Sequence, residues 1–101
     1  MIDLKDTSKL MNSADYKERF MAEYWQTKIR YEKLKNFNNK IEAASISQKA
    51  VMPKHDCPDH LLKEQQSVMG HYLSILEVRA VIEDIDLESA KYKYLDKEES
   101  R

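Results

Sequence analysis

Aromatic and basic side chains alternate along residues 24–35, an arrangement that suits nucleotide binding. Two rings and three cations interleave on adjoining faces of one helix: Tyr24, Lys28, Arg30, Tyr31 and Lys35. Aromatic rings stack on nucleobases, and basic side chains neutralise phosphates. The alternative interpretation is that the tyrosines belong to the core while the lysines face solvent.

Polar side chains also interrupt the apolar stripes of two long helical segments. Thr27 and Asn38 lie in the first stripe, and Gln65 and Arg79 fall near the centre of the second. A buried polar group costs free energy unless it has a partner, and an isolated buried charge costs more. We therefore expect these four side chains to be satisfied by each other, by a second copy of the chain or by a polar ligand.

Metal binding and covalent catalysis find little support. His55, Cys57 and His60 lie close together, but a closed zinc site needs four ligands, and the fourth is missing unless Asp56 or Asp59 joins. Cys57 lies near a predicted helix start, where thiols are often reactive. However, no histidine with an orienting group completes a catalytic triad with Cys57. There is no glycine-rich phosphate loop. We predict no metal, no cofactor and no enzymatic activity.

Composition excludes several further classes of protein. The formal net charge of −1 argues against binding DNA or RNA polymers, which needs a concentrated excess of lysine and arginine. No apolar run approaches the roughly 20 residues of a membrane span. A single cysteine is typical of the reducing cytosol. We predict a soluble intracellular protein that does not enter membranes.

One glycine and two prolines in 101 residues favour long helices over a turn-rich β fold. The first helix is predicted at about 14–45, capped by Asn12 or Ser13 with Asp15 near its positive end. The second is predicted at about 58–84, opened by a proline. The expected fold is all-α, an antiparallel hairpin within a homo-oligomeric bundle. Residues 1–12 are expected to be a polar N-terminal segment that forms a short turn or stays loose. Residues 13–86 form the hairpin domain, and residues 87–101 form a charged tail.

Successive helices joined by a short connection pack as antiparallel neighbours. One register pairs Tyr24 with Arg79 and Asn38 with Gln65, so that polar side chains meet, although the loop length permits neighbouring registers.

A two-helix hairpin is too small to be stable alone. Met21 and Trp25 lie on a second face of the first helix, and Gly70 lies where another backbone can approach closely. These residues predict self-association.

Two spaced patterns stand out within residues 15–83. The first helix ends in KL-x-x-F, and the second has the form LL-x-x-Q-x-x-x-M-x-x-Y-x-x-x-L-x-x-R. With them the chain resembles a family of small helical proteins common in crAss-like phages and, more loosely, the helical anti-CBASS proteins of tailed phages. The positions are Lys33, Leu34 and Phe37, followed by Leu61, Leu62, Gln65, Met69, Tyr72, Leu76 and Arg79.

The resemblance to anti-CBASS proteins implies homo-oligomers, typically hexamers, whose subunit interfaces bind cyclic oligonucleotide signals without cleaving them. In that family an aromatic ring stacks on a base, while basic, hydroxyl or amide groups hold the phosphates. Carried onto this sequence, it makes Tyr24 the stacking ring, sets Lys28 or Lys35 against phosphate, and has Arg79, Thr27 and Asn38 line a symmetry-related pocket.

The predicted function is therefore phage immune evasion in the host cytoplasm, by sequestering a cyclic di- or trinucleotide. One alternative is a helical oligomeric adaptor that binds a host or phage protein through Met21, Trp25 and the tyrosines. Another is a structural oligomer without a ligand. The longer N-terminal segment, interhelical loop and C-terminal tail depart from the anti-CBASS pattern and leave the nucleotide open.

Overall fold

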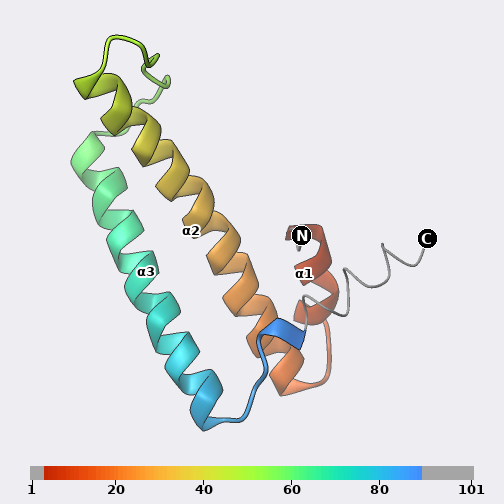
Figure 1. The fold of residues 1–101 in the computed structure, drawn as a ribbon. Helices are drawn as coiled ribbons and strands as arrows, with labels where there is room; N and C mark the ends of the chain where they lie inside the picture. The colour runs from red at the N-terminus through yellow and green to blue at the C-terminus, as the bar shows by residue number, and fades with distance from the viewer. Residues whose placement is uncertain (1–3, 90–101) are drawn as a thin grey trace.

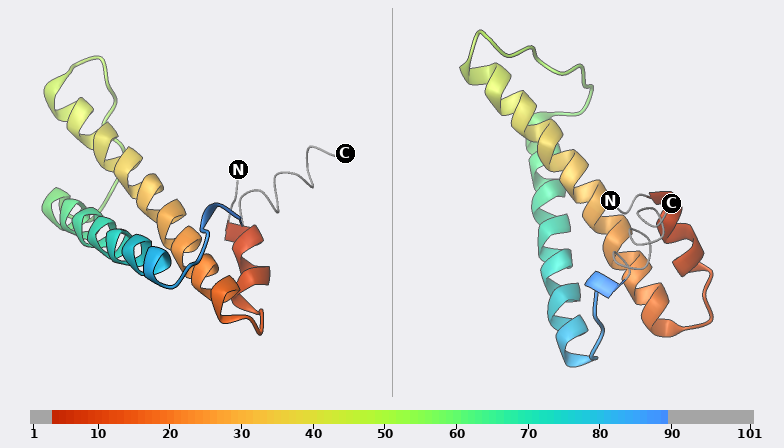
Figure 2. Two further views of the ribbon diagram at one scale, coloured as in Figure 1. Left: turned by 60° about the horizontal axis from the view of Figure 1, so that its bottom comes forward. Right: turned by 45° about the vertical axis from the view of Figure 1, so that its right-hand side comes forward.

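The computed structural model describes residues 4–89, and these form three helices with no strand among them. The helices are α1 (Leu4–Met11), α2 (Tyr16–Ile46) and α3 (Asp59–Ile82). α2 and α3 run side by side in opposite directions, and α1 lies against the N-terminal half of α2 (Figures 1 and 2). The predicted all-α class is confirmed. None of these helices is long and apolar enough to cross a membrane.

The start of α2 differs from the prediction. Asp15, not Asn12 or Ser13, is the capping residue: its backbone is extended, and its carboxylate accepts the Lys17 backbone N–H at 3.0 Å. The Ser13 hydroxyl instead accepts the Asp15 backbone N–H at 3.1 Å. Aspartate is among the strongest capping residues, so α2 begins two residues later than predicted.

α3 turns a different stripe toward α2 than the sequence predicted. Leu73, Leu76 and Ala80 are buried. Leu76 belongs to the predicted stripe, whereas Leu73 and Ala80 each lie one residue beyond a predicted position, Tyr72 and Arg79. One residue corresponds to a rotation of about 100° about the helix axis. Small residues explain the choice, because the Tyr31 ring packs where Gly70 has no side chain. A Cβ at Gly70 would lie only 3.1 Å from Tyr31 Cε1.

This rotation overturns three expectations. Gln65 and Arg79 lie on the exposed side of α3, not inside the hairpin. Gly70 admits an aromatic ring of its own chain, so it no longer indicates contact with another copy. The Asn38 amide meets Gln66 instead of Gln65.

α1 and the segment after α3 cover the second apolar face of α2. Leu10 of α1 and Ala22 form a small core to which Met21 and Trp25 also belong. The Trp25 indole N–H donates to the Leu87 carbonyl oxygen at 2.8 Å, and the chain after α3 returns across α2 (Figure 1). Met21 and Trp25 do lie on a second face of α2, but the chain itself covers that face, so they no longer indicate contact with another copy. Of the predicted tail, residues 90–101 lie outside the described residues.

Candidate functional site

Arg79 is held at the open end of the hairpin by groups from both long helices. Its Nη2 donates to the Tyr16 hydroxyl at 2.9 Å, and its Nε donates to the Glu83 carboxylate at 3.1 Å. Its guanidinium carbon lies 5.1 Å from the centroid of the Phe20 ring. The Arg79 side chain remains 48 % exposed, so it is accessible from solvent. Its predicted pairing with Tyr24 is therefore wrong.

The charges around Arg79 are coupled through Tyr16. The Tyr16 hydroxyl donates to the Glu83 carboxylate at 2.8 Å, and this hydrogen bond lowers the pKa of Glu83. The same hydrogen bond raises the pKa of Tyr16. Glu83 is thus ionised at neutral pH and occupies part of the guanidinium's donor capacity. A phosphate has the charge and acceptor oxygens to take the same donors.

A second polar group continues this side of the hairpin. Glu23 accepts from the Tyr72 hydroxyl at 3.1 Å and, at a long 3.4 Å, from the Thr27 hydroxyl. Burial raises the pKa of Tyr72, and the nearby Arg79 charge opposes that rise. We call this side the Arg79 seam; its members are Tyr16, Phe20, Glu23, Thr27, Tyr72, Arg79 and Glu83.

Tyr24, the predicted stacking ring, lies in the core. It is 6 % exposed and packs edge-on to the Trp25 ring, with the centroids 5.2 Å apart. Its hydroxyl donates to the Glu77 carboxylate at 2.7 Å. Burial and this hydrogen bond raise the pKa of Tyr24, and the charges of Glu88 and Glu32 add to the rise. The Tyr24 ring is therefore buried, and its hydroxyl faces acidic side chains.

The two predicted phosphate contacts on α2 lie away from the Arg79 seam. Lys28 forms an ion pair with Glu32 at 3.1 Å, and its Nζ lies 5.8 Å from the Tyr31 ring centroid. Lys35 is exposed one heptad further on. Helical spacing turns both lysines about 120–140° around α2 from Glu23, on the other side of the α2–α3 contact.

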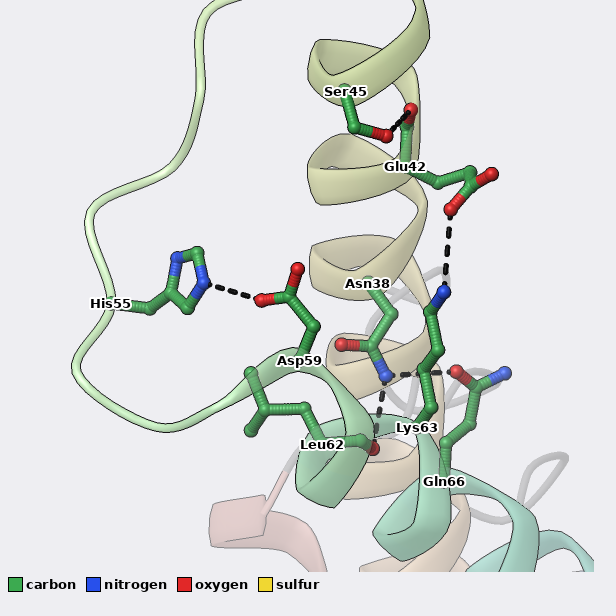
Figure 3. A network of polar contacts seen from close by, with 8 residues as sticks. All are labelled: Asn38, Glu42, Ser45, His55, Asp59, Leu62, Lys63 and Gln66. Carbon is green, nitrogen blue, oxygen red and sulfur yellow. Dashed lines mark hydrogen bonds and ion pairs between the residues drawn. The ribbon is translucent and has the colours of Figure 1, made fainter.

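Asn38 lies at the other end of the hairpin, near the loop (Figure 3). Its amide donates to the Leu62 carbonyl oxygen at 3.1 Å and to the Gln66 side chain at 2.9 Å. Among residues 4–89, no buried side-chain nitrogen or oxygen lacks a hydrogen-bond partner. The chain thus supplies partners for Thr27, Asn38 and Arg79 itself, while Gln65 is exposed to solvent and needs none of the three expected partners.

The structure brings together only some of the six predicted ligand residues. Thr27 and Arg79 share the Arg79 seam, whereas the other four lie elsewhere. Tyr16 and Glu83 were not among the predicted ligand residues. Two signals could have found them: the i,i+4 aromatic spacing of Tyr16 with Phe20, and the opposite charges of Arg79 and Glu83 at i,i+4.

The connection between α2 and α3 is pinned by His55. Its Nδ1 lies 2.7 Å from the Pro53 carbonyl oxygen and its Nε2 lies 2.8 Å from the Asp59 carboxylate, while the Phe37 ring packs edge-on against it. Both partners are acceptors, so only the doubly protonated imidazolium satisfies both contacts. Within the described chain, no three His, Cys, Asp or Glu side chains are grouped to hold a metal ion.

This geometry predicts a pH-dependent loop contact. The hydrogen bond to Pro53, then the one to Asp59, raises the pKa of His55 above its ordinary value, and the Asp56 charge adds to the rise. Its contribution to stability is therefore complete below about pH 6.5 and is lost as the pH rises through the raised value.

We expect the NMR titration midpoint of His55 to lie above its ordinary value of about 6.5. The midpoint should fall in Asp59→Asn. The matched control is Asp56→Asn, which removes a charge without removing a hydrogen bond and should lower the midpoint less. A wild-type midpoint at or below the ordinary value would contradict this contact.

Comparison with models of protein families finds a match to the hairpin. Residues 14–82, which contain α2, the connection and α3, match the model of the Sequestin family. No curated protein and no solved structure matches the chain. The match covers well over half of the chain and the whole hairpin that carries the Arg79 seam. The chain therefore belongs to the Sequestin family, whose name indicates a sequestering or binding role.

Proposed function

We propose that this chain sequesters a cyclic di- or trinucleotide without cleaving it, as a phage immune-evasion protein in the host cytoplasm. The observation that carries the proposal is the Sequestin match over residues 14–82, since the name of the family indicates retention of a ligand. The ligand class comes from the resemblance to anti-CBASS proteins. No cofactor takes part in this proposal.

The Arg79 seam supports a phosphate-bearing ligand. Arg79 presents a rigid fork of donors, is half exposed, and lies among the rings of Tyr16, Phe20 and Tyr72. Guanidinium groups bind phosphate through paired hydrogen bonds, and aromatic rings are surfaces for bases. Tyr24 offers less surface for stacking on a base, because its ring is buried.

The separation of the predicted ligand residues supports an oligomeric sponge. Lys28 and Lys35 lie on the opposite side of the α2–α3 contact from Arg79, so one chain cannot close all three around one small ligand. The side that carries the two lysines can meet the side that carries Arg79 only if they belong to different copies of the chain. We therefore propose a homo-oligomer, of six chains if it follows the resemblance, in which neighbouring chains complete each site.

Thermal unfolding with a panel of cyclic di- and trinucleotides tests the proposal. A ligand present at 100 times its Kd should stabilise the folded protein by about 2.7 kcal/mol. After denaturation the same ligand should be recovered chemically intact. Linear dinucleotides of the same bases are the matched control, and they should shift the midpoint less.

The other functions have distinct outcomes in this experiment. A ligand returned in altered form would point to an enzyme. No shift with any nucleotide would contradict the sponge and favour the adaptor. A docking surface made of Met21 and Trp25 is disfavoured, because α1 and the segment after α3 already pack on it.

A further inference from the structure

The outward side of α3 carries a second apolar stripe that nothing in the described chain covers. Leu61, Val68, Ile75 and Ile82 lie along it, and their side chains are between 43 % and 76 % exposed. Four large aliphatic side chains in one row form an exposed patch of the kind that marks an interaction surface.

The spacing of this stripe shows what kind of surface would cover it. Its four aliphatic residues recur every seven positions, and Gln65, Tyr72 and Arg79 each follow one of them by four. Alternating steps of four and three are the pattern by which one α-helix packs lengthwise on another. The occupant of this stripe is therefore a helix.

The order of residues along the stripe identifies that helix. Leu61 and Ile82 lie at its ends, and Gln65 and Arg79 are each seven residues from Tyr72. Turning the stripe end for end about a point between His71 and Tyr72 sets Leu61 against Ile82 and Val68 against Ile75, and brings the glutamine beside the arginine. A two-fold interface requires such a self-complementary surface.

We infer that α3 packs on α3 of a second copy, antiparallel, about a two-fold axis near Tyr72. The partner's Gln65 then lies beside Arg79, so that its amide joins the Arg79 seam. The assembly contains an even number of chains. This inference rests on the proposed function for the role of the seam, whereas the interface itself can be tested without any ligand.

Disulfide crosslinking in a Cys57→Ser background, which removes the exposed native thiol, tests the geometry. Tyr72→Cys should give a covalent dimer on mild oxidation, because the two thiols meet near the axis. Leu61→Cys alone should stay uncrosslinked, whereas Leu61→Cys combined with Ile82→Cys should crosslink. A dimer from Leu61→Cys alone would indicate parallel helices and overturn the inference.

Sedimentation tests the surface independently of crosslinking. Val68→Glu should abolish the assembly, while Val81→Glu, at a more exposed position on the opposite side of α3, should leave it unchanged. Circular dichroism at low concentration checks that both variants remain helical. A wild-type monomer at all concentrations, an odd number of chains, or an assembly that survives Val68→Glu would overturn the inference.

Nucleotide binding separates this inference from the proposed function. If wild type assembles through α3 but no nucleotide stabilises it, the sponge fails and the interface stands. If wild type binds a nucleotide while Val68→Glu leaves both the assembly and the affinity unchanged, the interface fails and the sponge stands.

Discussion

Arg79→Ala is expected to lower the affinity for a cyclic nucleotide about 10- to 100-fold. A hydrogen bond to a charged group contributes about 1.5–3 kcal/mol, and each 1.4 kcal/mol corresponds to about a tenfold change in Kd. Folding should be affected little, because the contacts of Arg79 with Glu83 and Tyr16 are both exposed, and an exposed ion pair contributes at most about 1 kcal/mol. Isothermal titration calorimetry measures the affinity, and urea unfolding measures the stability.

Two further variants sharpen this experiment. Arg79→Lys keeps the charge but loses the paired donors, so its affinity should lie between wild type and alanine. Arg30→Ala removes another exposed arginine from α2 and should bind like wild type. Sedimentation of each variant separates a lost phosphate contact from a lost assembly. Affinity equal to wild type in an assembled Arg79→Ala protein would remove Arg79 from the site.

The sequence predicted the long helices well because their ends carry local signals. Asp15 caps α2, and Pro58 precedes α3, so the observed limits lie within two residues of the expected ones. α1 was harder to predict. A helix of eight residues is marginal alone, and it depends on the burial of Leu10 against Ala22, a contact that spacing along the chain does not show.

The facing stripe of α3 could not be predicted for a different reason. Leu62, Met69, Leu73 and Leu76 form one helical stripe, and Leu61, Val68, Ile75 and Ile82 form another beside it. Periodicity detects both but does not rank them. The choice depends on the shape of α2, whose aromatic rings need the space beside Gly70 and Ala80.

That rotation by one residue also explains the outcome for the candidate site. The predicted cluster of buried polar groups required Gln65 and Arg79 to be buried between the helices, and both are exposed, although Arg79 still reaches Tyr16 and Phe20 of α2. Asn38 was correctly expected to need a partner, and it has one in Gln66. The ligand roles of the six residues stay predictions. Of the six, only Arg79 and Thr27 lie together in the Arg79 seam.

Tyr24→Ala is expected to destabilise the folded chain by about 3–5 kcal/mol, the range for removing a buried aromatic ring. Tyr24 is 6 % exposed and packs in one core with Phe20, Leu73 and Leu76. A small domain has only about 5–15 kcal/mol of stability in total, so this variant should be close to unfolding. Urea denaturation at one fixed protein concentration, followed by circular dichroism, measures the change.

Tyr24→Phe separates the ring from its hydroxyl. It keeps the packing and loses only the hydrogen bond to Glu77, an exposed carboxylate that water can solvate, so it should cost about 0.5–1.5 kcal/mol. Val81→Ala, at an 82 % exposed position, is the control for truncation and should change stability by under about 0.5 kcal/mol. If Tyr24→Ala unfolds at the same urea concentration as wild type, the ring is not part of the core and is free to stack on a base.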